Sequence, residues 1–228
     1  MSRVREGRWH LVLYGARRHS IPFWGVARAV PRDRAGRLPH GAQGRRDGAP
    51  PVISLPGSSI MLLIIGDSFA HHLATHLNSS WDVSCVGRRG ARLSDESFRR
   101  WAIATTINTR PTRVLLIVGG NDVAHPTFEQ RSLAALFEEL SLGLLAAGAD
   151  SVRILAIPPG TQLRAADVSA ACFSRRQRVA NSKLKGKFRR DPVMFRALCT
   201  SKGFLGRDGV HPSRRGWQTL CAVVRTLL

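Results

Sequence analysis

The chain has 228 residues, a length that suggests one domain with additional sequence. Its 35 lysines and arginines against 15 acidic residues give a formal net charge of +20, which points to polyanionic partners and carries no information about fold. No apolar run approaches the roughly 20 residues that a membrane span needs. The four cysteines form no CxxC pair and no dense framework, so we expect no metal site and reduced thiols inside the cell, in the cytoplasm or nucleus.

Residues 1–58 differ in composition from the rest of the chain. They hold eleven arginines against three acidic residues, with frequent glycine and proline. Such sequence buries too little apolar surface to fold, so we expect this basic N-terminal region to be mostly disordered. Two alternatives stay open, because an arginine-rich, acid-poor start is also typical of a mitochondrial presequence and because the gene start could be poorly defined. Serine is sparse here, which counts against the presequence. The folded domain is expected in residues 59–228.

The first predicted strand leads directly to a serine. Residues 60–65 are apolar without alternation, as in a parallel strand covered on both faces. Gly66 breaks the run and allows a sharp turn into a helix that begins near Ser68. Backbone N–H groups at a helix start have no partner within the helix, so they can stabilise an oxyanion formed at this serine. An ordinary N-cap is the other interpretation of Ser68, and the usual one after a strand.

Further along the chain, buried strands alternate with helices. We expect strands at 81–86, 114–118, 151–157 and 192–195, and helices at 94–106, 127–147, 170–189 and 214–228. Gly148 should follow the second of these helices as its C′ residue, and Ser213 should cap the last. Alternation of this kind predicts an α/β fold, in which helices cover both faces of a parallel sheet.

Two later loops carry polar residues that belong with Ser68. The strand at 114–118 ends in Gly119-Gly120-Asn121-Asp122, and Asp208-Gly209-Val210-His211 precedes the last helix. In an open parallel sheet the carboxyl ends of the strands gather at one edge, where ligands bind. We therefore expect Ser68 and Asn121 to face each other there, with His211 brought to them by the C-terminal loop. Taken singly, Asp-Gly is a common turn and asparagine tolerates left-handed backbone, so only the combination is informative.

The combination resembles a known family. Gly66-Asp67-Ser68, Gly90, Gly120-Asn121-Asp122 and Asp208-x-x-His211 are similar, in order, to the four blocks of the SGNH (GDSL-like) hydrolases. The resemblance covers residues 59–228 and departs at Phe69, where the namesake motif has leucine. It implies a three-layer αβα sandwich around a flavodoxin-like, five-stranded parallel sheet. It also implies a serine esterase that needs neither metal nor cofactor.

The expected roles follow from the chemistry of these residue types. A serine hydroxyl is a poor nucleophile until a base takes its proton, so Ser68 would attack while His211 acts as base and Asp208 holds the imidazole. The oxyanion donors would be the backbone N–H groups of Ser68 and Gly90 and the side-chain amide of Asn121. The predicted reaction is hydrolysis of small acyl or acetyl esters. We expect the acidic residues beside these motifs, Asp67 and Asp122, to make structural hydrogen bonds.

A second feature points to nucleic-acid binding. On the expected helix at 170–189, four basic side chains recur at helical spacing beside an apolar stripe: Arg175, Arg178, Lys185 and Arg189. Such a face is either merely solvated or follows an RNA or DNA backbone through electrostatic contacts. The alternative function is therefore a non-catalytic or bifunctional nucleic-acid-binding module, similar to the RNA-binding OSK domain of Oskar or to esterase domains in some retrotransposon first reading frames. The retained catalytic residues favour the enzyme.

Overall fold

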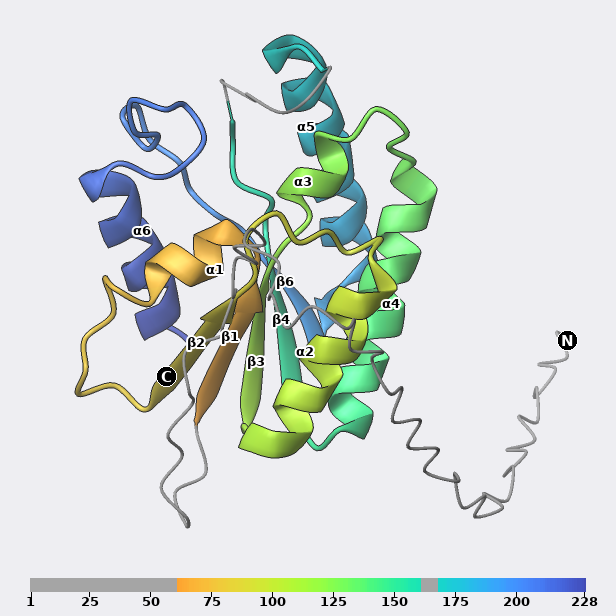
Figure 1. Cartoon of the computed structure of the whole chain (residues 1–228), viewed down its shortest axis with the longest axis vertical. Helices are drawn as coiled ribbons and strands as arrows, with labels where there is room; N and C mark the ends of the chain where they lie inside the picture. Colours follow the sequence, from red (N-terminus) through yellow and green to blue (C-terminus); the bar gives the residue numbers. More distant parts are fainter. Residues whose placement is uncertain (1–60, 161–167) are drawn as a thin grey trace, which may run out of the picture. The chain divides into compact units, whose positions relative to one another are not determined.

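The computed structural model describes residues 61–160 and 168–228 (Figure 1). The basic N-terminal region, residues 1–58, lies outside the described residues, so its expected disorder stays a prediction. In the part of the chain that the structure describes, no helix has the length and apolar character needed to cross a membrane.

A single mostly parallel sheet forms the centre of the described domain. Its strand order is β2-β1-β3-β4-β6-β5. The five parallel strands are β1 Leu62–Gly66, β2 Val83–Gly87, β3 Arg113–Ile117, β4 Ser151–Leu155 and β6 Val193–Arg196. This order of parallel strands is flavodoxin-like, which confirms the predicted fold class. The strand that was not predicted is β5, Arg189–Arg190, which pairs antiparallel with β6 at the edge of the sheet.

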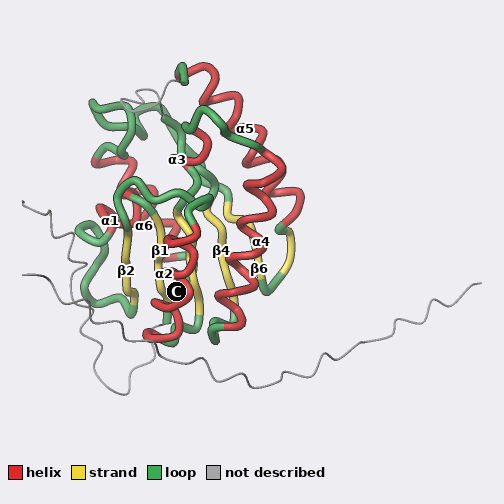
Figure 2. Tube along the Cα trace, turned by 45° about the vertical axis from the view of Figure 1, so that its right-hand side comes forward, coloured by secondary structure: helices red, strands yellow, loops and turns green. Residues whose placement is uncertain are grey.

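Helices cover both faces of the sheet (Figures 1 and 2). Side chains of α1 (Ser68–Leu73) and α6 (Arg214–Arg225) pack in one apolar cluster. Side chains of three helices pack in the other cluster: α2 (Glu96–Thr109), α4 (Gln130–Ala146) and α5 (Ala170–Lys187). The four-residue α3, Gly120–Val123, follows β3 almost directly. The result is the expected three-layer arrangement, with short elements at the carboxyl edge of the sheet.

The central strand β1 contributes to both apolar clusters. Leu63 and Ile65 belong to the cluster with α2, α4 and α5, whereas Leu62 and Ile64 belong to the cluster with α1 and α6. All four side chains are fully buried. Successive residues of a strand point to opposite faces, so a strand covered on both sides has no polar alternation. This is the physical basis of the unbroken apolar run in the sequence.

The turn from β1 into α1 depends on glycine at position 66. A Cβ on Gly66 would lie 2.0 Å from the carbonyl oxygen of Ile117 in the neighbouring strand. The backbone N–H of Asp67 donates to that same carbonyl at 3.1 Å. The backbone therefore remains in contact with β3 up to Asp67, the residue before α1. This contact fixes Ser68 at the carboxyl edge of the sheet.

Two helices begin later than their sequence patterns predict. The N-cap of α2 is Asp95, because the backbone N–H of Asp95 still closes a turn onto Arg92. The start of α4 moves to Gln130, because Thr127 belongs to a turn in which its hydroxyl bonds His125 Nδ1 at 2.9 Å. The caps at the other predicted ends are confirmed: Gly148 has a left-handed φ of +104° after α4, and Ser213 accepts from Gly216 N at 3.2 Å.

Candidate active site

Ser68 is the first residue of α1 and does not cap it. The cap is Asp67, whose carboxylate accepts the backbone N–H of Phe69 at 2.9 Å. The ordinary interpretation of Ser68 as an N-cap is therefore wrong, because the preceding residue already fills that role. Its hydroxyl is half-buried and is left available for another partner.

That partner is His211, which is 143 residues away in the sequence. The Nε2 atom of His211 lies 3.2 Å from Ser68 Oγ. On the other side of the ring, Nδ1 lies 2.7 Å from Asp208 Oδ2. A carboxylate can only accept, so Nδ1 carries the proton and Nε2 is the acceptor for the serine hydroxyl. The structure thus joins the three residues predicted as a triad in one continuous chain of hydrogen bonds.

The Asp208 carboxylate is oriented by its own loop. Its second oxygen accepts the backbone N–H groups of Val210 and His211, each at 3.0 Å. The hydrogen bond from the His211 ring is the main reason why the pKa of Asp208 falls to about 2, and these two backbone bonds lower it further. Asp208 is therefore ionised at neutral pH, as a group that holds an imidazole must be.

His72, which the sequence analysis did not assign to the site, lies against the ring of His211. The two ring centroids are 5.1 Å apart in an edge-to-face arrangement, and Phe69 lies 5.9 Å from His211 on α1. Burial lowers the pKa of His72, and the positive charges of His211 and Arg89 lower it further. The spacing in the sequence indicates only that His72 lies on the same face of α1 as Ser68, four residues before it, and says nothing of the contact with His211.

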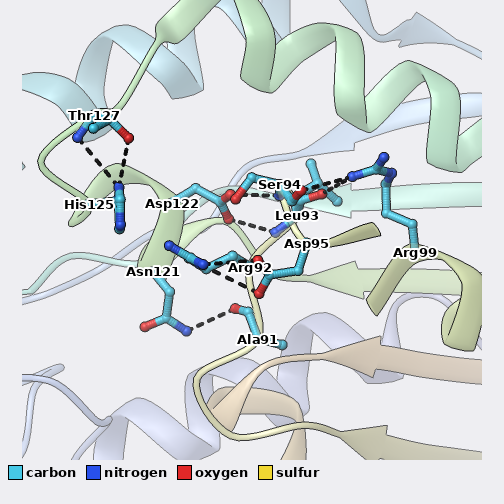
Figure 3. A network of polar contacts seen from close by, with 10 residues as sticks. All are labelled: Ala91, Arg92, Leu93, Ser94, Asp95, Arg99, Asn121, Asp122, His125 and Thr127. Atoms are coloured by element: carbon cyan, nitrogen blue, oxygen red, sulfur yellow. Dashed lines mark hydrogen bonds and ion pairs between the residues drawn. The ribbon is translucent and has the colours of Figure 1, made fainter. Parts of the chain in front are cut away.

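The loop after β2 is tied to the loop after β3 by side chains of Asn121 and Asp122 (Figure 3). The Asn121 amide donates to the carbonyl oxygen of Ala91 at 3.0 Å. The Asp122 carboxylate accepts the backbone N–H of Leu93 at 2.8 Å and that of Ser94 at 2.9 Å. The predicted structural role of Asp122 is confirmed. Each Asn121 amide has two N–H groups, so the bond to Ala91 leaves one of them for a ligand.

Gly90, the third predicted oxyanion donor, lies in the tied loop. Its φ is +72°, a left-handed conformation that favours glycine, and the residue is exposed. The structure therefore places Gly90 at the same edge as Ser68 and Asn121. It records no hydrogen bond that joins Gly90 to either of them in the described residues, so the donor role of Gly90 stays a prediction.

A buried carboxyl lies beneath the site. Asp67 is 4% exposed, and burial is the main reason why its pKa rises to about 7, helped by the nearby charge of Asp122. Near neutral pH, Asp67 is thus divided between its protonated and ionised forms. Its capping bond to Phe69 confirms the predicted structural role.

Ser68 and Asn121 open onto one small cavity. Its volume is about 50 Å³, well below the roughly 300 Å³ or more of sites that enclose a whole small ligand. Most of the other lining side chains are apolar: Phe69, Ile117, Val118, Ala124, Pro158, Pro159, Phe173 and Val210. The cavity beside Ser68 is therefore mostly apolar and too small to enclose a whole small-molecule ligand.

The basic residues predicted to bind nucleic acid lie on α5 and β5. All four are exposed: Arg175, Arg178, Lys185 and Arg189. Arg189 does not belong to the helix, because α5 ends at Lys187 and Arg189 starts β5. The predicted apolar stripe is buried at all four positions, Phe173, Ala180, Leu184 and Phe188, although Phe188 is the C-cap of α5 and no longer part of the helix. The structure does not bring this basic face together with Ser68 and His211 by any contact among the described residues.

The comparisons with known proteins place the fold. No family model matches the chain, and no curated protein matches it in sequence. Solved structures do match: a GDSL-like lipase from Bacteroides thetaiotaomicron aligns with a TM-score of 0.57 and 15% identity over 74% of this chain and 87% of its own. A carbohydrate esterase from Talaromyces cellulolyticus gives 0.52 and 18%, over 74% and 98%. An acetyl xylan esterase gives 0.53 and 14%, over 74% and 100%. The described domain therefore has the fold of these lipases and esterases.

Proposed function

We propose that this protein is a serine esterase that hydrolyses small acyl esters, acetyl esters above all. One observation carries the proposal, namely the hydrogen-bonded chain from Ser68 Oγ through His211 to Asp208. Each link has the length and the atom pairing that nucleophilic catalysis needs. Proteins of the same fold that bear the names lipase, carbohydrate esterase and acetyl xylan esterase support the reaction class.

In the first half of the reaction, Ser68 becomes acylated. His211 Nε2 takes the hydroxyl proton as Ser68 Oγ bonds to the ester carbonyl carbon. The carbonyl oxygen becomes an oxyanion, which the Asn121 amide and the backbone N–H groups of Ser68 and Gly90 stabilise. The bond from carbon to the alcohol oxygen then breaks, and the alcohol leaves with the proton from His211. Asp208 stays ionised throughout and stabilises the imidazolium.

In the second half, water releases the acyl group. His211 takes one proton from the water as its oxygen bonds to the acyl carbon, and the same donors stabilise the second oxyanion. The bond between carbon and Ser68 Oγ breaks, and Ser68 recovers its proton from His211. One ester and one water give one carboxylic acid and one alcohol. The sequence of steps uses neither metal nor cofactor.

The size of the cavity supports a preference for short acyl groups. A space of about 50 Å³ beside Ser68 fits an acetyl group better than a long chain. We therefore expect kcat/KM for p-nitrophenyl esters to fall from acetate through butyrate to octanoate. Highest activity on the octanoate would contradict the preference for short acyl groups and leave the serine mechanism intact.

Labelling by a fluorophosphonate probe tests the reaction class directly. We expect the wild-type protein to be labelled and Ser68→Ala to be unlabelled and inactive. His211→Ala should lose nearly all hydrolysis, and the double variant should be no worse, because the two residues act as a unit. Ser97→Ala is the matched control, since Ser97 is an exposed serine on α2. Substantial p-nitrophenyl acetate turnover by Ser68→Ala would show that another residue is the nucleophile.

A further inference from the structure

Five exposed arginines lie on the segments that form the carboxyl edge of the sheet. Arg88 and Arg89 follow β2 and directly precede Gly90, and Arg207 directly precedes Asp208. Arg214 and Arg215 are the first residues of α6, three and four positions after His211. We call these five the rim arginines. Together they favour a positive electrostatic potential at this edge, which an approaching molecule would meet first.

The pair after β2 is anchored close to the proposed nucleophile and base. The backbone N–H of Arg88 donates to the carbonyl oxygen of Gly66 at 3.0 Å, and its guanidinium lies 4.4 Å from the ring centre of Trp101. Arg89 is near enough to lower the pKa of His72, whose ring lies 5.1 Å from that of His211. The positive charge of Arg89 therefore lies near His72, which in turn contacts the proposed base His211.

Four acidic side chains at this edge make contacts of their own, and they are fewer than the five rim arginines. Asp208 bonds the His211 ring, Asp122 bonds two backbone N–H groups, and Asp67 is buried as the cap of α1. Asp95 pairs with Arg92 at 2.9 Å. Within residues 61–160 and 168–228, no ion pair neutralises any of the rim arginines. An anion at the rim would thus meet a net positive charge.

The size of the cavity determines which part of the substrate reaches these charges. The space beside Ser68 has room for a short acyl group, so the alcohol part of an ester would lie outside it, at the edge of the sheet where the rim arginines are found. We propose that the natural substrates are esters whose alcohol part is anionic, with carboxylate or phosphate groups a few bonds from the esterified oxygen. The inference rests on the proposed esterase function and adds the charge of the substrate to it.

Three phenyl acetates whose para substituents differ in charge test the inference. They are 4-acetoxyphenyl phosphate, 4-acetoxybenzoate and the neutral 4-acetoxybenzamide, and each kcat/KM is divided by the rate at which neutral imidazole cleaves the same ester. At low salt we expect the order phosphate, benzoate, benzamide, with about two- to fivefold for each step, the scale of an exposed charge pair. Salt weakens the interaction between exposed charges, with a screening length of about 10 Å at 0.1 M, so the ratios should shrink as salt is added.

Substitution of rim arginines supplies the second arm. The triple variant Arg89→Gln, Arg214→Gln, Arg215→Gln should bring the phosphate-to-benzamide ratio down about tenfold or to near one. The matched control carries Arg110→Gln, Arg190→Gln and Arg225→Gln, which remove three exposed arginines from the end of α2, from β5 and from the end of α6. The control should keep the wild-type ratio, so a general loss of net charge cannot imitate the effect.

The outcomes separate this inference from the proposed function. Wild-type protein that hydrolyses all three esters with equal corrected efficiency is an esterase without charge preference, and the inference is then wrong. An unchanged ratio in the triple variant also overturns it, because the preference would then come from elsewhere. Hydrolysis of no ester, or equal hydrolysis by Ser68→Ala, contradicts the esterase function and the inference together. If the phosphate ester is preferred while the benzoate and the benzamide react alike, the rim selects phosphate and not carboxylate.

Discussion

Asp208 keeps its negative charge at every pH above about 4. Its pKa of about 2 is due first to the hydrogen bond from His211. An aspartate with a depressed pKa stabilises the fold above the pKa of about 3.9 that it has when unfolded, and this contribution disappears as the pH falls from about 4 to about 2. Loss of activity above pH 4 therefore cannot come from protonation of Asp208.

Replacement of this carboxylate is the corresponding test. We expect Asp208→Asn to lower kcat by about 10²–10⁴ at every pH, because an amide neither fixes the imidazole tautomer nor stabilises the imidazolium. A kcat pH profile of both proteins checks this, with Asp150→Asn as the control at an exposed carboxylate next to β4. Wild-type kcat in Asp208→Asn would mean that the loop backbone alone orients His211.

Asp67 gives a second prediction, which concerns stability. Its pKa of about 7 means that the folded protein holds this proton more tightly than the unfolded chain, mainly because the carboxyl is buried. The corresponding stabilisation is complete below about pH 4 and is lost as the pH rises through about 7. Asparagine caps a helix as well as aspartate does but does not ionise.

We therefore expect the stability of Asp67→Asn, relative to wild type, to improve by about 2–4 kcal/mol between pH 4.5 and pH 8. Urea unfolding at the two pH values measures the difference. Asp67→Ala should show the same pH slope but lie about 1 kcal/mol lower throughout, because it also loses the cap. If wild type and Asp67→Asn respond to pH alike, Asp67 does not titrate in this range.

At the scale of elements, α5 holds the short helix that carries Asn121. The guanidinium of Arg176 donates to the carbonyl oxygen of His125 at 2.8 Å and to that of Val123 at 3.3 Å. It also lies 5.6 Å from the ring centre of Phe128. One carbonyl belongs to the last residue of α3 and the other to the turn that follows it, so Arg176 fixes where α3 ends and thereby helps to position the Asn121 amide.

Arg176→Leu should therefore act on catalysis through Asn121. We expect it to cost about 1–3 kcal/mol of stability and to lower kcat with little change in KM, because oxyanion binding is felt only in the transition state. In an Asn121→Ala background, which itself loses about 10²–10³ in kcat, most of the further loss should vanish. Arg178→Leu removes an exposed arginine of the same helix and serves as the control. Fully additive losses would mean that Arg176 acts elsewhere.

The elements differ in how well the sequence predicts them, for physical reasons. Signals that depend on a few adjacent residues were reliable: the apolar run of β1, the cap at Ser213 and the left-handed Gly148. The two-residue β5 was not predicted because so short a strand has no periodicity of its own, and its pairing with β6 decides where α5 ends. The parallel sheet followed from the alternation of elements, whereas its flavodoxin-like strand order was implied by the resemblance to the SGNH hydrolases.

The site shows the same division. The meeting of Ser68 and His211 was predicted because both follow strands or loops at one edge of a parallel sheet. The capping role of Asp67 was not predicted, because the choice between adjacent polar residues depends on the exact backbone angles of the turn. The packing of His72 against His211 was likewise missed, since ring contacts between α1 and a distant loop depend on side-chain geometry.

For the whole molecule, the basic face of α5 and β5 gives a prediction that is independent of catalysis. Exposed cations that follow a phosphate backbone release counterions, so affinity for single-stranded RNA should fall by about 0.7 log units per contact for each tenfold increase in salt. In the test variant, glutamine replaces all four basic residues: Arg175, Arg178, Lys185 and Arg189. We expect this variant to bind RNA more weakly and to show a shallower dependence of affinity on salt. It should keep its activity on p-nitrophenyl acetate. Filter binding at several salt concentrations measures this. Equal affinity and slope would show that the face is only solvated.

The two arginines of β5 protect the edge of the sheet against association between copies of the protein. A strand at the edge of a sheet presents unpaired backbone groups that can join the sheet of another molecule, and charged side chains prevent this. Arg189 and Arg190 are both exposed on β5, the last strand in the order. The double substitution Arg189→Val and Arg190→Val would leave this edge strand able to pair with the sheet of a second molecule. Solutions of such a protein should then scatter light increasingly with concentration, while parent solutions at the same ionic strength stay clear.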